Sequence, residues 1–348
     1  MKTAVTIKDI AEQLGLSRNT VAKALNGKYV PESTRNLILD KARELNYKSF
    51  GSSAVNSEPP KKSKRILLLS GKPLNNMGFF VPIIKSIENF CFMGRHELFQ
   101  YTFNADIMTF ASLSEHIKSI NADGIIAIET FDKDFIAKLV NLKLPICFID
   151  FAPTRSIPIT GNFDIVKTND VKSIYGITRQ LHKRYGVTKF CFVGDITHCM
   201  SFQDRYFGMI QALAMDSITH TKRDDILRSD NFDYGNIAAI KSEMYKLRGK
   251  PECFICANDF IARSVCTALQ QLNIKVPEGC LITGYDNVSE ASSYTPSITS
   301  FECDKESLGV EAASALLNRI NHSQYTYTRS IIVHTKTILR SSTERQSL

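Results

Sequence analysis

The chain has no apolar run long enough to cross a bilayer. Its start, MKTAVTIKDI, lacks the apolar segment of a secretory signal, and no later stretch approaches the roughly 20 apolar residues that a spanning helix needs. We therefore expect no membrane association and a cytoplasmic location. With 348 residues, 43% of them hydrophobic and 22% charged, the chain is too apolar for disorder and is long enough for two or three globular units.

The sequence also lacks the short motifs of common catalytic and nucleotide-binding sites. No G-x-S-x-G, Walker, H-E-x-x-H or G-x-G-x-x-G segment occurs, and the seven histidines are scattered. The nine cysteines are odd in number, and no His/Cys cluster has zinc-ligand spacing. We expect no enzymatic activity, no cofactor and no metal. Buried, reduced thiols are expected in apolar runs at Cys147, Cys191, Cys253, Cys256 and Cys280.

Positive charge is concentrated at the N-terminal end. Residues 1–65 carry 13 Lys and Arg against 6 Asp and Glu, a net +7, whereas the rest of the chain carries 30 against 29. A local excess of this kind is typical of a module that binds a polyanion and is attached to a neutral body. A solvated basic tail is the alternative, and the helix signals in the same segment argue against it.

Residues 6–47 read as three short helices. Thr6 and Ser17 are suited to cap the first two, and the third begins near Pro31. The composition then changes to a small, polar, Pro-containing stretch without apolar periodicity. We therefore predict a headpiece over residues 1–50 and a linker over residues 51–64.

The first two helices have the spacing of a helix-turn-helix. Ala11 permits close crossing, Gly15 suits a turn with positive φ, and Val21 locks the pair from inside. Arg18 and Asn19 then point outward, where Arg can read guanine and Asn can read adenine. Ala22 and Lys23 share this outward face. Contacts that set the register on phosphates are expected from Thr6, Ser17, Thr20, Asn26, Lys28 and Tyr29.

From residue 65 onward, short apolar runs alternate with amphipathic segments. This alternation predicts parallel sheets covered by helices on both faces, the doubly wound class. The helical stretch from Asp170 to Tyr185 separates two groups of strands, which indicates two lobes. The predicted strands are RILLLSG, ELFQYTF, DGIIAIE, PICFID, KFCFVGD, ECFICAND and CLITGYD.

Residues 6–47, TIKDIAEQLGLSRNTVAKALNGKYVPESTRNLILDKARELNY, closely resemble the headpiece of LacI/GalR-family bacterial transcription regulators. The resemblance continues through SFQDRYFGMIQAL, CANDFIARSV, VPEGCLITGYDNVSEASSYTPSITSF and ILRSST. It implies an all-α helix-turn-helix headpiece and an α/β periplasmic-binding-protein-like core over residues 65–348. We expect an N-lobe over about 65–168 and 296–323, and a C-lobe over about 169–295 and 324–345. The resemblance also implies a homodimer on double-stranded, pseudo-palindromic operator DNA.

The chain departs from the family after the third helix. The family has a Pro-Asn-Ala-Ala-Arg-Ser-Leu-like hinge helix, whose leucine wedges into the minor groove and kinks the operator. Here the segment reads KSFGSSAVN, without that proline or leucine, and Asn56 falls where the leucine would lie. Val55 is a smaller candidate wedge, and the Gly-Ser content disfavours a stable hinge helix.

Polar residues at strand ends are the candidates for a small-molecule site. Asp150, Asn258 and Asp286 each follow an apolar strand, and ligands in open α/β sheets bind at the carboxyl ends of strands. Asp or Asn at such positions can instead cap the next helix, which we expect for Asp259, and an arginine can pair with a local carboxylate. The resemblance places effector contacts at Phe79, Asp150, Arg205, Phe232, Asn258 and Asp286. The two phenylalanines can equally be core.

These observations predict a DNA-binding transcriptional regulator, most simply a repressor, whose operator affinity is controlled by a small effector. A carbohydrate or sugar phosphate fits a cleft with a few fixed polar groups and an aromatic wall. The alternatives are a purine effector, or a core that only dimerises or binds a protein partner.

Overall fold

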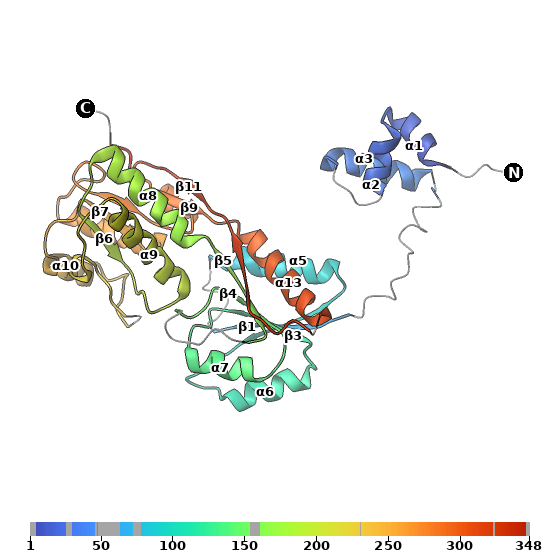
Figure 1. The fold of residues 1–348 in the computed structure, drawn as a ribbon, viewed down its shortest axis with the longest axis horizontal. Coiled ribbons are helices and arrows are strands. Elements are labelled where there is room, and N and C mark those ends of the chain that lie inside the picture. The colour runs from blue at the N-terminus through green and yellow to red at the C-terminus, as the bar shows by residue number, and fades with distance from the viewer. Residues whose placement is uncertain are drawn as a thin grey trace. The chain divides into compact units, whose positions relative to one another are not determined.

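The computed structural model describes most of the chain. The described residues are 5–25, 30–45, 47, 63–71, 78–153, 161–229, 231–322 and 324–345. The chain divides between Lys62 and Ser63 into two compact units, a small helical headpiece and a larger α/β core (Figure 1). The headpiece and the core are each described by themselves.

The headpiece forms because local signals fix where its helices begin and end. Thr6 and Asp9 form a reciprocal capping box at the first helix, and Gly15 ends it with a φ of 65°. Ser17 Oγ accepts a hydrogen bond of 3.1 Å from Thr20 N, which caps the second helix. These predicted caps are confirmed. The helices are α1 (Ile7–Leu14), α2 (Arg18–Leu25) and α3 (Glu32–Glu44). They bury Ile10, Ala11, Val21, Ala24, Ile38 and Ala42.

The first lobe of the core is a parallel sheet of six strands in the order β10-β5-β4-β3-β1-β2. Its elements are β1 (Arg65–Ser70), α5 (Val81–Met93), β2 (Glu97–Thr102), α6 (Phe110–Ser119), β3 (Gly124–Ile128), α7 (Lys133–Asn141), β4 (Ile146–Ile149), β5 (Phe163–Thr168), α13 (Lys305–Asn321) and β10 (Arg329–Val333).

Side chains alternate between the two faces of this sheet. Ile66 and Leu68 of β1 pack with α5 and α13 on one face, whereas Leu67 and Leu69 pack with α6 and α7 on the other. Figure 1 shows α5 and α13 side by side, with α6 and α7 across the sheet from them. Because both faces are covered, the strands are near-continuous apolar runs, as the sequence predicted.

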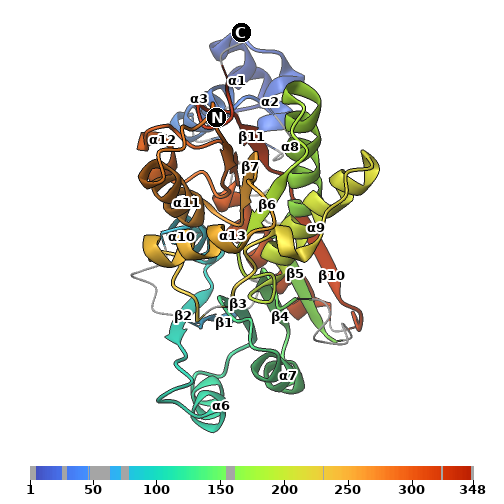
Figure 2. The same cartoon turned by 90° about the vertical axis from the view of Figure 1, so that its left-hand side faces the viewer.

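The second lobe is built on the parallel strands β6-β7-β8. Helices α8 and α9 pack against each other beside these strands, and α10 packs on α11 (Figure 2). Its elements are α8 (Asp170–Tyr185), β6 (Phe190–Val193), α9 (Met200–Met215), η3 (Lys222–Asp224), α10 (Ile237–Lys246), β7 (Cys253–Cys256), α11 (Asp259–Gln271), β8 (Leu281–Thr283), α12 (Ser289–Ser293), β9 (Ser300–Glu302) and β11 (Lys336–Ile338).

The lobe boundaries near the C-terminal end differ from the prediction. Strand β9 pairs with β11, and Thr299 bridges to Thr283 at the end of β8, so residues 299–302 belong to the second lobe. Strand β10 pairs with β5 and therefore belongs to the first lobe, although residues 324–345 were assigned to the second. The prediction was wrong because β10 alternates between half-buried and exposed positions, the pattern of an edge strand rather than of a buried one.

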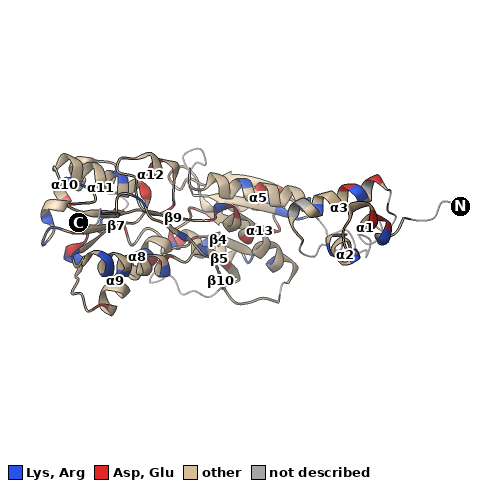
Figure 3. Ribbon diagram, turned by 90° about the horizontal axis from the view of Figure 1, so that it is seen from above, with Lys and Arg blue, Asp and Glu red and all other residues tan. Residues whose placement is uncertain are grey.

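The cysteines of the core are all free and buried, which confirms the expected reduced thiols. Both signs of charge are scattered over the helices of the core (Figure 3). Among the described residues, no helix combines the length and the apolarity needed to span a bilayer.

Candidate ligand cavity and nucleic-acid interface

The outward face of α2 is the candidate nucleic-acid interface. Arg18, Asn19 and Lys23 are exposed, while Val21 and Ala24 of the same helix are buried. This division follows from helical periodicity, because positions 21 and 24 lie on one side of the helix and positions 18, 19 and 23 on the other. The helix therefore presents a guanidinium, an amide and an ammonium group to solvent from one surface.

Other predicted contacts have local structural roles as well. The Thr6 hydroxyl donates to Asp9 Oδ2 at 2.8 Å, and the Ser17 and Thr20 hydroxyls lie 2.8 Å apart. Thr6 and Ser17 remain exposed, so these caps still face solvent. Ala22 is half-buried. Asn26, Lys28, Tyr29 and nearly all of the predicted linker lie outside the described residues.

A cavity of about 270 Å³ lies between the lobes of the core. Its walls come from the loops that follow the parallel strands, where the doubly wound fold places ligands. We call this cavity the inner chamber. Five of the six predicted effector residues line it: Phe79, Asp150, Arg205, Asn258 and Asp286. Phe232 does not line it. That ring instead packs edge-on against Tyr234, with 4.9 Å between ring centroids, at the border of the second-lobe core.

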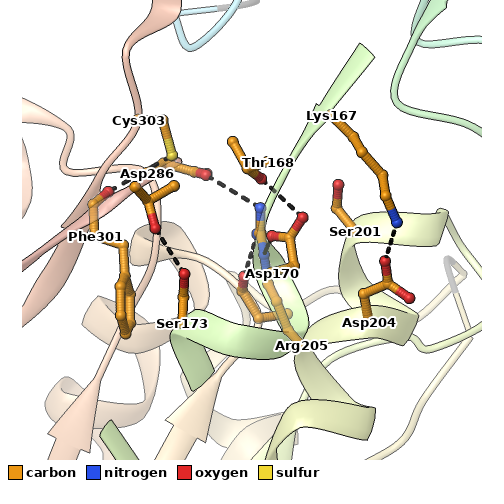
Figure 4. Close-up of polar contacts among 12 residues, drawn as sticks. Lys167, Thr168, Asp170, Ser173, Ser201, Asp204, Arg205, Asp286, Phe301 and Cys303 are labelled. Atoms are coloured by element: carbon orange, nitrogen blue, oxygen red, sulfur yellow. Dashed lines mark hydrogen bonds and ion pairs between the residues drawn. The ribbon is translucent and has the colours of Figure 1, made fainter. Parts of the chain in front are cut away.

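Arg205 is at the centre of a buried polar cluster (Figure 4). Its Nε donates to Asp170 Oδ1 at 2.7 Å, and Nη1 donates to the Ala257 carbonyl at 2.6 Å. Its Nη2 lies 3.6 Å from Asp286 Oδ1, and the guanidinium stacks 3.6 Å from the ring centroid of Tyr285. Burial alone would lower the pKa of Arg205, but the charges of Asp170 and Asp286 hold it well above its ordinary value.

The chamber's other cation is Lys167 of β5. Its ammonium donates to the Asp204 carboxylate on α9 and lies 3.4 Å from Met200 Sδ (Figure 4). The lysine comes from the first lobe and its partner from the second, so the pair joins the lobes beside the cavity. Burial raises the pKa of Asp204, and the bond from Lys167 offsets this only in part. Asp204 is thus the partner of Lys167, whereas Arg205 pairs with Asp170 rather than with Asp204, its neighbour in the sequence.

Asp150 and Asp286 both line the chamber, and both have strained backbone conformations. Their φ angles are 61° and 97°, in the region that few non-glycine residues adopt. Asp150 Oδ1 accepts from Phe151 N at 2.7 Å and from Ser201 N at 3.1 Å, so it caps α9 of the other lobe. Burial raises the pKa of both carboxyls. The nearby charge of Asp170 adds to this effect, whereas Arg205 opposes it at Asp286.

The cap of α11 comes from Asn258 rather than from Asp259, where the sequence placed it. The Asn258 side chain accepts from Ile261 N at 3.0 Å and so caps α11, although it also lines the cavity. Asp259, the expected cap, is buried and accepts from Ser300 Oγ at 2.7 Å and Val288 N at 3.0 Å. The prediction for Asp259 was wrong because the first residue of the helix points toward the β8 loop rather than along the helix.

Several lining residues were missed by sequence reasoning. Phe131 of the first lobe and His198 of the second meet edge to face at 4.9 Å, and His198 contacts Phe202 at 5.5 Å. Lys167 lies in β5, a strand that was not predicted. Asp170, which pairs with Arg205 behind the lining, was read only as a helix start. The remaining lining residues missed are Phe80, Glu129, Ile149, Val166, Thr168, Cys199, Ser201 and Leu308. Glu129, Ile149 and Thr168 lie at strand ends, whereas Ser201 and Leu308 lie in helices and carried no such signal.

An all-α headpiece with helix-turn-helix geometry, joined to a two-lobed core with a polar cavity between its lobes, defines the class of one-chain DNA-binding regulators that carry their own ligand-binding domain. The comparisons with known proteins narrow this class. Residues 178–343 match the family described as a periplasmic binding protein-like domain.

Curated relatives align along almost the whole chain. The chain is 25% identical over 344 residues to the HTH-type transcriptional repressor PurR of Aliivibrio salmonicida, covering 98% of this chain and 99% of the relative. It is 26% identical over 346 residues to PurR of Pasteurella multocida, with 97% and 98% covered. These relatives support the interpretation of the chain as a LacI/GalR-family transcriptional regulator.

Solved structures show the same fold. The transcriptional regulator CelR in complex with cellobiose superposes with a TM-score of 0.70 at 18% identity, covering 97% of this chain and 99% of the other. The lac repressor dimer bound to operator and the anti-inducer ONPF gives a TM-score of 0.66 at 18% identity, with 98% and 99% covered.

Proposed function

We propose that this protein is a sequence-specific transcriptional repressor whose affinity for operator DNA is set by a neutral carbohydrate bound in the inner chamber. The observation that carries the proposal is the charge arrangement there. Both cations of the chamber are already neutralised by protein carboxylates, Lys167 by Asp204 and Arg205 by Asp170. The carboxylate and amide oxygens that remain are suited to accept hydrogen bonds from hydroxyl groups.

The same arrangement disfavours a sugar phosphate. Glu129, Asp150 and Asp286 line the chamber in addition to the two neutralised cations, so a ligand there would meet further carboxyl groups and no unpaired cation. A phosphate would have to displace Asp170 or Asp204 from its cation and leave a carboxylate without its partner in a desolvated site. A polyol has no charge to place there.

A purine is the second candidate, because the chamber is rich in flat side chains. Phe79 and Phe80 line it from the first lobe, and Phe202 and His198 line it from the second. A planar heterocycle could stack among these rings, whereas a sugar would present C–H surfaces to them. Direct titration with sugars and with nucleobases distinguishes the two ligand classes.

Ligand binding is expected to favour one arrangement of the lobes. Asp150 and Lys167 of the first lobe contact Ser201 and Asp204 of α9 in the second. A ligand between these groups binds one spacing of the lobes better than another, and only such differential affinity can shift a conformational equilibrium. The interlobe contacts are thus the proposed route from effector to DNA affinity.

On the headpiece, we propose that Arg18 and Asn19 read base edges and that Lys23 and the exposed caps Thr6 and Ser17 contact the backbone. The family pattern of a homodimer on a two-fold operator is part of the proposal, as is a cytoplasmic location, where operator DNA is accessible. The relatives are regulators rather than enzymes, and we propose no catalysis.

The proposal is tested by selecting genomic fragments that bind the purified protein. Candidate sugars are then titrated against the selected fragment in a mobility-shift assay. We expect a two-fold symmetric site whose affinity changes with one sugar. No preference over random DNA would contradict the role in operator recognition. A preferred site that responds to no sugar and no nucleobase, in a core that no small molecule stabilises against heat, would favour a core that only dimerises or binds a protein partner.

A further inference from the structure

A second, larger cavity shares part of its wall with the inner chamber. This outer chamber has a volume of about 660 Å³ and lies between the start of α5 in the first lobe and the starts of α11 and α12 in the second. The two chambers share five lining residues: Phe79, Phe80, Glu129, Asn258 and Asp286. These residues form the boundary between the chambers, so a ligand in one chamber is in contact with the wall of the other.

The inner chamber alone is small for a ligand site. Pockets for small molecules commonly span about 300–1,000 Å³, and at about 270 Å³ the inner chamber falls just below that range. It is sized for one ring. A ligand that used both chambers would need a second ring-sized part beyond the boundary residues that the two chambers share.

The outer chamber has polar groups suited to a second sugar unit. Arg263 Nε is buried and, among the described residues, has no hydrogen-bond partner. Its guanidinium lies 6.0 Å from the ring centroid of Tyr294. Such an unsatisfied donor is costly in the absence of a partner, and a hydroxyl oxygen would satisfy it. Glu290 and Ser289, which are hydrogen-bonded to each other at 2.9 Å, supply acceptors on the same wall.

The outer chamber also has an aromatic surface. Phe260, the second residue of α11, lines it with 54% of its surface exposed. An exposed ring beside a guanidinium and a carboxylate offers a face for C–H groups together with donors and acceptors for hydroxyls. No anionic ligand is indicated, because Glu290, Asp286 and Glu129 outnumber the cations Arg263 and Lys305 on this lining. Lys305 already donates to the Asp286 carbonyl at 2.8 Å.

We propose that the effector is a carbohydrate of at least two linked units, with one unit in the inner chamber and the next in the outer chamber against Phe260 and Arg263. This inference rests on the proposed function, because it specifies the size of the ligand for the same site. It assigns to Arg263 a role in selecting ligand length, separate from the cluster around Arg205 that binds the inner unit.

The test is calorimetric titration of the full chain with a panel of disaccharides, including cellobiose, maltose and lactose, and with their component monosaccharides. We expect one disaccharide to bind at least tenfold more tightly than either of its components. In the Arg263→Met variant, this advantage should fall about tenfold while the affinity for the monosaccharide stays the same. Arg248→Met, which removes an arginine that lines neither chamber, should leave both affinities unchanged.

The outcomes distinguish a failure of the two-chamber assignment from a failure of the proposed carbohydrate effector. A monosaccharide that binds as tightly as every disaccharide containing it would overturn the two-chamber assignment and leave the carbohydrate effector standing. An Arg263→Met variant that folds, judged by its thermal midpoint, and loses both ligands equally would also overturn it. Binding of a nucleobase instead of any sugar, or binding of neither class, would overturn the carbohydrate effector itself.

Discussion

Two buried arginines of the core, Arg319 and Arg205, each form an ion pair with a buried aspartate, but the two pairs have different roles. Arg319 of α13 is fully buried, and Asp164 of β5 accepts from both Arg319 and Arg329. All three guanidinium nitrogens of Arg319 donate within the protein: Nε and Nη2 donate to Asp164, and Nη1 donates to Asn162 Oδ1. Nη2 also donates to the Phe163 carbonyl at 3.1 Å and the Tyr327 carbonyl at 3.0 Å. This cluster borders none of the cavities described above.

Arg205 differs in what lies beside it. Its cluster also contains a buried carboxylate, Asp170, but one side of the arginine lines the inner chamber, where Asp286 lies 3.6 Å away without a short hydrogen bond. The Arg319 cluster stabilises the packing of α13 on the sheet, whereas the Arg205 cluster positions a polar surface toward a ligand. The sequence around each arginine does not distinguish these roles, because the partners Asp164 and Asp170 are distant in sequence and the difference is the presence of an adjacent cavity.

The largest effect is expected from Asp164→Asn. Burial alone would raise the pKa of Asp164, but the hydrogen bonds from Arg329 and Arg319 hold this pKa below its ordinary value. The carboxylate is therefore ionised between two cations. Removing its charge should lower the free energy of unfolding by about 3–5 kcal/mol, because Arg319 is left buried without its counter-charge. Denaturant unfolding measures this loss. Asp216→Asn, at a more exposed arginine pair, is the control and should cost less. Equal losses would mean that burial does not distinguish the pairs.

A different kind of effect is expected from Arg205→Gln. The variant should lose the thermal stabilisation by effector, which at a ligand concentration of 100 times Kd amounts to about 2.7 kcal/mol. Operator binding without effector should persist, because the headpiece does not depend on this cluster. Arg179→Gln removes a guanidinium that pairs with Asp216 away from the chamber, and it should keep the full response. A retained response in Arg205→Gln would place the ligand elsewhere.

Arg18 extends the comparison to an arginine that is exposed in the described headpiece. Arg18→Ala should weaken operator binding by roughly 1–3 kcal/mol and relax the preference at one base pair. Lys28→Ala should instead weaken binding to all sequences similarly and flatten its salt dependence, as expected for a phosphate contact. Binding measurements on single-base operator variants at several salt concentrations check both. Equal loss on every sequence for both variants would contradict base reading by Arg18.

The headpiece could be predicted in detail because its determinants are local. Thr6, Gly15 and Ser17 act on residues three or four positions away, and a helical period decides which side of α2 is buried. The apolar strands of the core were equally plain, since full burial on both faces makes them continuous runs. Strand β5, whose apolar run is interrupted by Asp164 and Lys167, the edge strand β10 and the short β9 escaped prediction because they lack that signal.

The cavity could be predicted only in part. Strand-end reasoning and the family resemblance found Asp150, Arg205 and Asp286, but no sequence rule pairs Lys167 with Asp204 or brings Phe131 to His198. Those contacts join the two lobes and depend on how the lobes face each other. Residues that meet across a lobe boundary have no shared periodicity, so their contacts become visible only in three dimensions.

A pH-dependent effect is expected at Asp259, a buried carboxyl hydrogen-bonded by Ser300 and Val288 rather than by an arginine. Burial raises its pKa from 3.8 to about 7, and the neighbouring Asp286 adds to this effect. The unfolded chain therefore releases this proton near pH 3.8, while the folded chain keeps it up to about pH 7. The free energy of unfolding should fall as pH rises through this window and level off above it.

Asp259→Asn removes that proton equilibrium and keeps a side-chain oxygen to accept from Ser300. Its stability should depend less on pH between about 4 and 7 than that of the unmodified protein, while the slope contributed by Asp150 and Asp286, whose pKa values are also raised, remains. Denaturant unfolding across this pH range measures the difference. An unchanged slope would mean that Asp259 is ionised in the folded protein. In that case the positive charge of Arg340, which lowers the pKa of Asp259, would stabilise the Asp259 carboxylate, as Arg319 and Arg329 stabilise that of Asp164.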